Sequence, residues 1–360
     1  DPESVAFARV ETVLRAHPEV TLACIAYVNA DELITLSLLA SPSVHVHGSA
    51  RTQLEQMCEA LWAILEHRDP MTMPLHLTSL ANPHPQPMST DMPKGMAGER
   101  LEDQFLRRAQ DIPHVPALTC CTSVSPPTFV SWSYQELDTR SNEIAQLLWS
   151  CGVGYAAAQS DDDQVVVLCM AKCMDMYAAI LGVLKAGATW CPIDPGWPSS
   201  RQSALLIKSG ARVALTTGAE APMVESSCPE HIQVVRLDRP FPSLTSLPPR
   251  TVERSSASHL AYKIWTSGTT GLPKAVGVEH IAAVQGMRAL QKAVPTDMDA
   301  PVRPGAIRYL QFAAYVFDLS IFDIFYAWGH GGTVCFAPLD LLLTRLVDVA
   351  NALQVTHTLL

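Results

Sequence analysis

The segment of this sequence best suited to chemistry is a loop of hydroxyls and glycines that ends in a lysine, Thr266-Ser-Gly-Thr-Thr-Gly-Leu-Pro-Lys274. Glycines let a backbone wrap closely around an anion, so that successive N–H groups point at phosphate oxygens while Ser and Thr hydroxyls add donors. Lys274 supplies a mobile positive charge for the same phosphates. The loop is not a Walker A motif, because Pro273 stands where that motif has the glycine before its lysine. Ordinary turn chemistry is the alternative interpretation.

An apolar strand must lead into this loop, and a helix must follow it. Residues 260–265 are strand-like, and a helical pattern starts at about Ile281. Upstream, strands are predicted at 165–170, 189–193, 212–216 and 233–237, and helices at 137–148, 177–184 and 199–208. A stretch rich in Pro and Ser, 220–258, interrupts the alternation. Alternating strands and helices predict an α/β fold with helices packed on mostly parallel sheets.

Two aspartates belong to a further helical pattern. Asp318 precedes Leu-Ser-Ile-Phe-Asp-Ile-Phe and suits a helix N-cap, since its short carboxylate can accept from the first free N–H groups. We expect Asp323, later in the same helix, to face solvent or a neighbouring helix without a catalytic role. The aromatic residues Trp265, Tyr315 and Trp328 are expected to pack rather than to stack on a base.

Composition and charge exclude several classes of protein. The chain has 360 residues, of which 48% are hydrophobic and 17% charged, with a formal net charge of −10. That apolar content is enough for a core, and the negative charge disfavours electrostatic binding of nucleic acid. No apolar run reaches the ~18 residues that a membrane span needs. We therefore expect a cytoplasmic protein with neither a nucleic-acid nor a membrane partner.

The cysteines do not suggest a metal site. There are 10 of them, and none forms a CxxC pair. Structural zinc sites need paired ligands at short spacing, so buried and reduced thiols are the better interpretation. No residues can be assigned as metal ligands from the sequence.

The residue composition and pattern of the chain change twice along its length. Residues 1–67 predict a small α+β piece, and residues 68–100 form a proline-rich stretch without helical or strand period. Such a stretch is typical of a linker. We therefore predict three parts: the piece 1–67, the linker 68–100 and a larger domain at 101–360.

The phosphate-type loop and three other segments together resemble a known family. Thr266 to Lys274 resembles the phosphate loop of adenylate-forming enzymes, the AMP-binding superfamily, and specifically of nonribosomal peptide synthetase adenylation domains. Three further motifs of that family are matched in the right order by Trp132-Ser-Tyr-Gln-Glu-Leu137, Leu184-Lys-Ala-Gly-Ala-Thr-Trp-Cys-Pro-Ile-Asp-Pro195 and Leu310-Gln-Phe-Ala-Ala-Tyr-Val-Phe-Asp-Leu-Ser-Ile-Phe-Asp-Ile-Phe325. The resemblance implies that 101–360 folds as the large N-terminal subdomain of such an enzyme, present incompletely.

The resemblance also implies a reaction. The carboxylate of an α-amino acid attacks the α-phosphate of ATP, which gives an aminoacyl adenylate and pyrophosphate. The acyl group then passes to a phosphopantetheine thiol on a separate carrier domain, in peptide secondary-metabolite biosynthesis. The implied partners are carrier and condensation domains of the same assembly line. Mg²⁺ is expected to accompany ATP, with protein ligands that remain unassigned.

Two groups of site residues follow from the same resemblance. The ATP phosphates are expected to bind Thr266, Ser267, Gly268, Thr269, Thr270, Gly271 and Lys274. Asp318 is expected to pair with the α-ammonium of the amino acid, an interpretation that competes with its reading as a helix cap. Leu319 and Phe322 are expected to line the amino-acid pocket. No catalytic residue is assigned.

The N-terminal piece, residues 1–67, resembles the end of a condensation domain. Its apolar runs at 20–28 and 33–39 suit a hairpin, whereas apolar residues within 7–14 and within 54–65 recur at helical spacing. The condensation motif HHxxxDG does not occur in the sequence.

Departures from the family pattern leave alternatives open. Lys263 stands where the family has an apolar residue on a buried strand, Ala275 replaces a glycine, and Trp265 replaces Tyr or Phe. The later motifs and the mobile C-terminal subdomain of the family have no match here, so we expect this chain alone to be inactive. The alternatives are a non-catalytic truncated remnant or scaffold, and an acyl- or aryl-CoA ligase of the same superfamily. Asp318 argues against the ligase, because an acid without an amine has no use for it.

Overall fold

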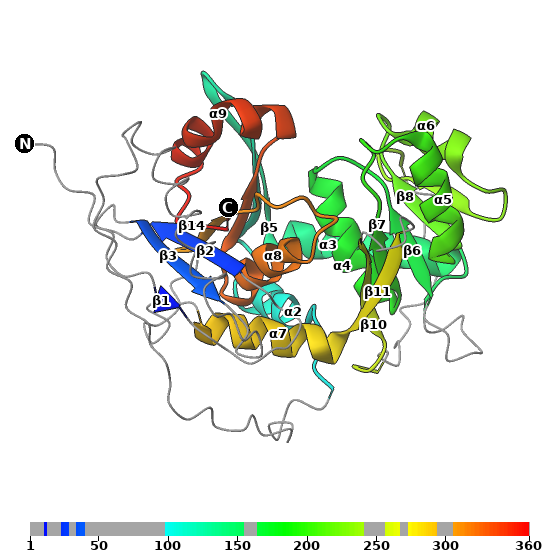
Figure 1. The fold of residues 1–360 in the computed structure, drawn as a ribbon, viewed down its shortest axis with the longest axis horizontal. Coiled ribbons are helices and arrows are strands. Elements are labelled where there is room, and N and C mark those ends of the chain that lie inside the picture. Colours follow the sequence, from blue (N-terminus) through cyan, green and yellow to red (C-terminus); the bar gives the residue numbers. More distant parts are fainter. Residues whose placement is uncertain are drawn as a thin grey trace, which may run out of the picture. The chain divides into compact units, whose positions relative to one another are not determined.

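The chain divides into two compact units, residues 1–89 with 360 and residues 90–359. The computed structural model (Figure 1) describes residues 11–12, 23–28, 34–39, 98–154, 164–240, 256–266, 273–293 and 305–359. The boundary between the units falls inside the predicted linker, 68–100. The three-part division of the chain stays a prediction.

In the first unit, the described residues form one three-stranded sheet. Its strands are β1 (Glu11–Thr12), β2 (Ala23–Val28) and β3 (Ile34–Leu39), in the order β1-β3-β2. The antiparallel pairing of β2 with β3 confirms the predicted hairpin. The helix predicted within 7–14 is wrong at Glu11–Thr12, because β1 pairs with β3 and this tertiary contact overrides the local periodicity. The helical pattern at 54–65 lies outside the described residues, and the likeness to a condensation domain stays a prediction.

The second unit contains a six-stranded sheet of order β11-β10-β7-β6-β8-β9. The strands are β6 (Val165–Leu168), β7 (Thr189–Pro192), β8 (Val213–Thr216), β9 (Gln233–Arg236), β10 (Leu260–Thr266) and β11 (Lys274–Glu279). Neighbouring strands run parallel except for the antiparallel pair β10–β11. The predicted mostly parallel sheet is therefore confirmed. The carboxyl ends of its five parallel strands lie on one side.

A five-stranded sheet of order β14-β12-β13-β4-β5 completes the second unit. Its strands are β4 (Pro116–Val124), β5 (Pro127–Ser133), β12 (Arg308–Leu310), β13 (Thr333–Phe336) and β14 (His357–Thr358). The pair β4–β5 is an antiparallel hairpin, and the remaining pairs are parallel. Sequence reasoning missed this hairpin, whose outer strand β5 is mostly exposed and carries no alternation of burial.

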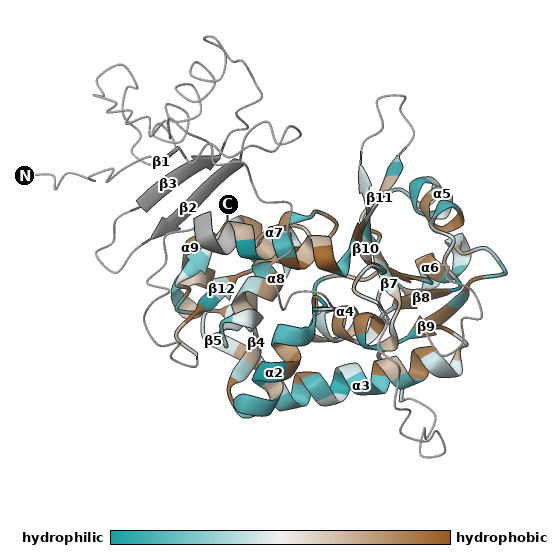
Figure 2. Cartoon of the chain, turned by 90° about the horizontal axis from the view of Figure 1, so that it is seen from below, coloured by the Kyte–Doolittle hydropathy of each residue, from teal (hydrophilic) through white to brown (hydrophobic). Residues whose placement is uncertain are grey.

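Helices cover both sheets. They are α2 (Asp103–Asp111), α3 (Tyr134–Ser150), α4 (Met174–Ala186), α5 (Ser199–Ser209), α6 (Ala221–Ser227), α7 (His280–Ala293), α8 (Leu319–Gly329) and α9 (Leu339–Ala352). Figure 2 shows that α2 and α3 carry many hydrophilic residues, whereas the strands of the six-stranded sheet are largely hydrophobic. Among the described helices, none combines the length and hydropathy needed to cross a bilayer.

Local signals explain where several helices begin and end. Helix α3 starts with a capping box, in which the Ser133 side chain accepts from the Glu136 amide at 3.2 Å and the Ser133 amide donates to Glu136 at 2.7 Å. Helix α4 ends at Gly187, whose φ of 80° is a left-handed conformation that glycine adopts without strain. Helix α6 was missed in the Pro- and Ser-rich stretch, although a proline in the first helical turn is well tolerated.

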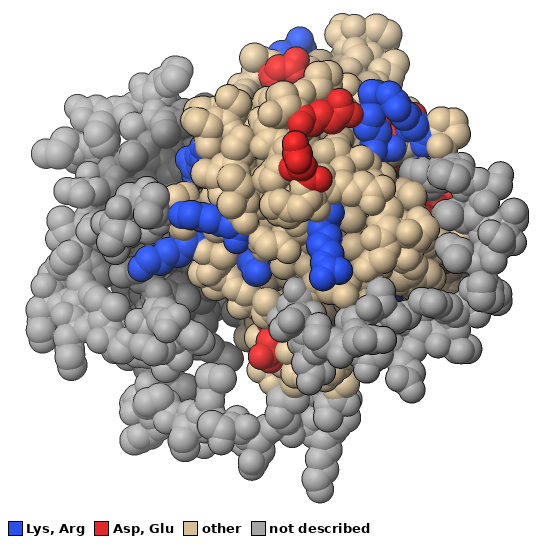
Figure 3. All heavy atoms as spheres, turned by 90° about the vertical axis from the view of Figure 1, so that its right-hand side faces the viewer, with Lys and Arg blue, Asp and Glu red and all other residues tan. Residues whose placement is uncertain are grey.

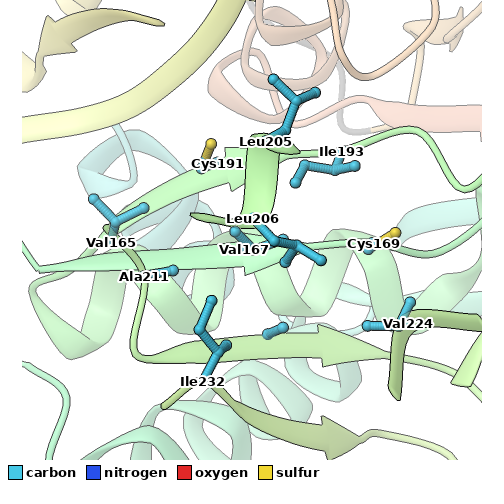
Figure 4. Close-up of a cluster of buried hydrophobic side chains, with 11 residues drawn as sticks. Val165, Val167, Cys169, Cys191, Ile193, Leu205, Leu206, Ala211, Val224 and Ile232 are labelled. Atoms are coloured by element: carbon cyan, nitrogen blue, oxygen red, sulfur yellow. The ribbon is translucent and has the colours of Figure 1, made fainter. Parts of the chain in front are cut away.

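A hydrophobic core joins the six-stranded sheet to α5 and α6. Figure 4 shows eleven of its buried side chains, Val165, Val167, Cys169, Cys191, Ile193, Leu205, Leu206, Ala211, Ala214, Val224 and Ile232. Burial raises the pKa of the Cys169 and Cys191 thiols to about 12, so both are neutral packing groups. Burial of the cysteines is confirmed at Cys120, Cys121, Cys169, Cys191 and Cys335, whereas Cys151, Cys173 and Cys228 are half-buried.

Helix α4 lies between the two sheets (Figure 1). Its residue Tyr177 packs on Phe336 of β13 with ring centroids 4.8 Å apart and on Trp328 of α8 at 6.5 Å. On another side, Gly182 approaches α3 so closely that an added Cβ would lie 2.7 Å from the Ile144 side chain and 3.0 Å from the Ser141 carbonyl oxygen. This glycine therefore sets the α3–α4 spacing.

We predict opposite effects from two Gly→Ala substitutions in helices. Gly182→Ala should lower the free energy of unfolding by roughly 1–3 kcal/mol, because the new methyl overlaps the α3 backbone and Ile144. Gly286→Ala, in α7, meets nothing within 4 Å and should raise it by roughly 0.5–1 kcal/mol through helix propensity. Urea denaturation followed by circular dichroism measures both. A stabilised Gly182→Ala variant would show that α3 and α4 are not in close contact.

Candidate functional site

The phosphate-type loop connects the two strands of an antiparallel hairpin. Thr266, the last residue of β10, pairs with Lys274, the first residue of β11, and the Thr266 hydroxyl donates to the Lys274 carbonyl oxygen at 3.3 Å. The Lys274 side chain is exposed. Ser267, Gly268, Thr269, Thr270 and Gly271 lie outside the described residues. The predicted helix after the loop is confirmed as α7, but the intervening strand β11 was missed.

The three departures from the family pattern lie in this hairpin. Lys263 is only half-buried, so the expectation that it occupies a fully buried strand position is wrong and the large cost of a buried unpaired charge does not arise. Ala275 is exposed next to Lys274. Trp265 packs against the core of the six-stranded sheet, which confirms its expected packing role.

Asp318 lies at the N-terminus of α8, after the carboxyl end of β12. Its carboxylate accepts from the Leu319 amide at 2.9 Å, so the helix-cap interpretation is confirmed. The side chain is nevertheless exposed, which leaves further acceptor capacity for a ligand. Burial raises the pKa of Tyr262 to about 12, and the Asp318 charge adds to this effect. Asp318 therefore lies near β10, the strand that leads into the phosphate-type loop.

The two other predicted pocket residues differ in their surroundings. Leu319 is 50% exposed beside Asp318, whereas Phe322 is 5% exposed and packs on the rings of Tyr326 at 4.9 Å and Tyr309 at 6.4 Å. Sequence reasoning missed Phe317, which is 60% exposed directly before Asp318. The apolar surface that flanks the carboxylate is thus formed by Phe317 and Leu319, and the pocket roles of Leu319 and Phe322 stay predictions.

The segment that leads from β12 to α8 is tied to the six-stranded sheet. The Lys172 ammonium donates to the carbonyl oxygens of Gln311 at 2.9 Å and Phe312 at 3.1 Å. The buried Tyr315 hydroxyl donates to the Ile193 carbonyl oxygen at 2.7 Å, which confirms Tyr315 as a packing residue. Sequence reasoning missed Lys172, because nothing local distinguishes a lysine after a buried strand from a solvated one.

Asp323 is fully buried in α8, so of the two expected surroundings, solvent or a neighbouring helix, solvent is wrong. Helix α8 is apolar on nearly all sides, and the helix therefore has no solvent face for a polar residue. Within the described part of the chain, neither carboxylate oxygen of Asp323 has a partner at hydrogen-bonding geometry. Burial raises the pKa of this carboxyl to about 7, although Tyr309, Lys172 and Gln311 lie close enough to offset part of the shift.

The charge of Lys172 is affected by the same buried surroundings. Burial lowers the pKa of its ammonium to about 8, and the nearby Asp323 carboxylate acts in the opposite direction. Lys172 also binds the backbone of Gln311 and Phe312, at the start of the segment that leads to Asp318. No group of three or more potential metal ligands occurs among the residues that the structure describes. On the face shown in Figure 3, charges of both signs are scattered over a surface that is mostly neither, in line with the low charged fraction of 17%.

The chain is similar to known proteins over most of its length. The model of a family described as AMP-binding enzyme matches residues 105–360. The ferrichrome siderophore peptide synthetase of Mycosarcoma maydis is 40% identical over an alignment of 370 positions, which covers 96% of this chain and 9% of that protein. Nonribosomal peptide synthetase fso1 of Omphalotus olearius is 34% identical over an alignment of 341 positions, which covers 92% of this chain and 7% of that protein. The chain thus spans under a tenth of the length of these curated relatives.

Solved structures share the fold of the larger unit. A crystal structure of the nonribosomal peptide synthetase FmoA3 matches with a TM-score of 0.56 at 26% identity, over 72% of this chain and 25% of that chain. Its AMPPNP-bound form matches with a TM-score of 0.56 at 27% identity, over 69% and 24%. A fatty acyl-adenylate ligase from L. pneumophila, with a TM-score of 0.57 at 17% identity over 70% and 42%, shares the fold alone. These similarities confirm the predicted fold of the larger unit.

We predict that Asp323 makes the stability of the fold depend on pH. Its pKa of about 7 lies above the ~3.9 of an unfolded aspartate, so the folded chain holds an extra proton between these values. Wild-type stability should therefore fall as pH rises through that window. Asp323→Asn has no proton to lose, and its stability relative to wild type should grow by roughly 1–3 kcal/mol from about pH 5 to pH 8.

Urea denaturation across that pH range measures the difference. Asp340→Asn is the matched control, because Asp340 is an exposed acid in the first turn of α9. A difference between Asp323→Asn and wild type that stays flat with pH would show that Asp323 does not hold its proton in the fold.

Proposed function

Because the chain belongs to the AMP-binding enzyme family, as an adenylation region of the nonribosomal peptide synthetase type, we propose that it activates an α-amino acid with ATP. The products are an aminoacyl adenylate and pyrophosphate. The observation that carries this proposal is the position of Asp318, an exposed carboxylate close to the strand that leads into the phosphate-type loop. An anionic group at that place can hold a substrate ammonium while the substrate carboxylate meets a nucleotide.

The substrate amine is recognised by charge. Asp318 accepts hydrogen bonds from the α-ammonium in addition to the Leu319 amide. When the substrate is bound, Phe317 and Leu319 exclude water beside this ion pair, which strengthens it. An acid without an amine would leave Asp318 covered and unpaired, and this penalty excludes it. Asp318 therefore selects amino acids over other carboxylic acids.

The nucleotide phosphates are held at the hairpin loop. Thr266 and Lys274 frame its two ends, and the hydroxyls and amides of 267–271 complete the phosphate contacts. A substrate carboxylate oxygen attacks the α-phosphorus, and the bond from that phosphorus to the bridging oxygen of the leaving group breaks. Pyrophosphate departs with the bonding electrons, while Lys274 neutralises negative charge on the phosphates. The contribution of the protein is mainly positioning and electrostatic stabilisation.

Magnesium and the carrier thiol are part of the proposal. We infer that Mg²⁺ enters with the triphosphate, since Mg²⁺ is usually bound through substrate phosphates together with one or two carboxylates. The metal neutralises phosphate charge when it is bound. A phosphopantetheine thiol of a carrier domain would then attack the acyl carbon of the adenylate, so that the aminoacyl group passes to sulfur as a thioester and AMP leaves, in an assembly line of the kind that the curated relatives represent.

We predict that Asp318 is required for amino-acid activation. In the natural polypeptide that contains this sequence, amino-acid-dependent pyrophosphate exchange should lose roughly 10²-fold or more in kcat/KM on Asp318→Ala, since the substrate ammonium loses its partner. Asp340→Ala, an exposed first-turn acid of α9, is the control and should retain wild-type exchange. Equal exchange with the matching carboxylic acid that lacks the amine would instead identify an acyl- or aryl-CoA ligase.

Nucleotide binding tests the hairpin separately. Lys274→Met should weaken binding of a fluorescent ATP analogue by roughly tenfold, because a charge-assisted contact to phosphate is lost. Lys208→Met, an exposed lysine in the last turn of α5, should bind as the wild type does. If the wild type binds no nucleotide in any form, the non-catalytic scaffold becomes the better interpretation. The expectation that the 360 residues alone are inactive stays a prediction, and exchange at a normal rate by this chain would contradict it.

A further inference from the structure

The two parts of the proposed site belong to different sheets. The phosphate-type loop follows the carboxyl end of β10 in the six-stranded sheet, whereas Asp318 follows the carboxyl end of β12 in the five-stranded sheet. Ligands of open α/β sheets bind outside the carboxyl ends of the strands. The distance between Asp318 and the loop therefore depends on how the two sheets are joined at these ends.

Three side chains make this junction. Lys172, which follows β6, donates to the carbonyl oxygens of Gln311 at 2.9 Å and Phe312 at 3.1 Å. Tyr315 reaches back across the junction and donates to the Ile193 carbonyl oxygen, after β7, at 2.7 Å. Tyr177 of α4 donates to the Gln311 side-chain oxygen at 3.1 Å. Each of these bonds joins the segment 311–317 to the six-stranded sheet or to the helix that follows β6.

Lys172 binds the backbone at the start of this segment, at Gln311 and Phe312. The Gln311 amide completes the parallel pairing by donating to the Cys335 carbonyl oxygen at 2.8 Å, so the chain leaves the sheet directly after it. From there, the carbonyl oxygens of Gln311 and Phe312 turn to the ammonium of Lys172. One lysine thereby fixes two successive peptide groups, and the direction in which the chain continues to Asp318 follows from them.

We propose that Lys172 is a positioning residue for amino-acid recognition: by binding the backbone of Gln311 and Phe312, it sets the place of Asp318 relative to the phosphate-type loop. This inference rests on the proposed function, since it assigns Lys172 to the same site. Lys172 itself contacts neither the amino acid nor the nucleotide. Its effect is transmitted through residues 311–317 to a single carboxylate, so it should change amino-acid binding more than nucleotide binding.

The first experiment separates positioning from general stability. In the natural polypeptide, Lys172→Met keeps the aliphatic stem but removes the donors, and Lys172→Arg restores donors to the same carbonyl groups. For pyrophosphate exchange, we expect Lys172→Met to raise KM for the amino acid roughly tenfold and to change KM for ATP less than about twofold. Lys172→Arg should recover most of the loss, and the exposed-lysine control Lys208→Met should match the wild type.

Each outcome decides the proposal. A selective rise in the amino-acid KM with rescue by arginine supports it, whereas unchanged constants, or equal changes in both KM values, overturn it. If Lys172→Met does not fold, Tyr315→Phe takes its place, because that variant keeps the ring and removes the bond to Ile193 from the same junction. The same selective rise is then expected, and its failure to occur counts against the proposal.

A second measurement tests the positioning role of Lys172 even if the proposed function is wrong. When the wild type supports no exchange, hydrogen exchange of the amides in 313–318 is compared between wild type, Lys172→Met and Lys208→Met. If the amides of 313–318 exchange at least about tenfold faster in Lys172→Met than in the control, Lys172 fixes this segment. Equal protection in all three proteins would overturn the positioning role, whatever the reaction proves to be.

Discussion

The arrangement of the larger unit depends on the burial of one helix. Helix α4 is apolar around almost its whole circumference, and its residues from Met176 to Leu184 are all buried. A helix of this kind is stable only when other elements surround it. Here α3, the two sheets and α8 do so, with Tyr177 in contact with both β13 and α8. Since α4 must be covered on both sides, one sheet lies on each side of it.

The polar groups around the candidate site differ in their exposure to solvent. Asp318 is exposed and caps helix α8, whereas Asp323, within that helix, is fully buried and retains its proton to near neutral pH. Lys172 lies between these extremes, with two backbone carbonyl groups as its partners. Burial is therefore the main cause of the raised pKa of Asp323.

The sequence predicted the features that depend on neighbours along the chain. Alternating apolar patterns predicted most strands and helices of the parallel sheet, and the position of Asp318 before a helical run predicted its cap. Features set by distant neighbours were not predictable in this way. Lys172 binds residues 139 and 140 positions away, and Asp323 is buried because its helix lacks a solvent face. A polar residue in an apolar pattern gave no sign of which side of the fold it would meet.

The hairpin β10–β11 has a consequence for how such a protein changes over generations. Strand β11 is the edge of its sheet, and nearly all of its side chains are exposed. Substitutions at Lys274, Ala275 or Val276 therefore cost the fold little, so purifying selection on abundance barely acts there. Only selection on the chemical product can maintain these positions. The proposed phosphate-binding end can thus be lost or changed in a lineage while the protein itself continues to fold and accumulate.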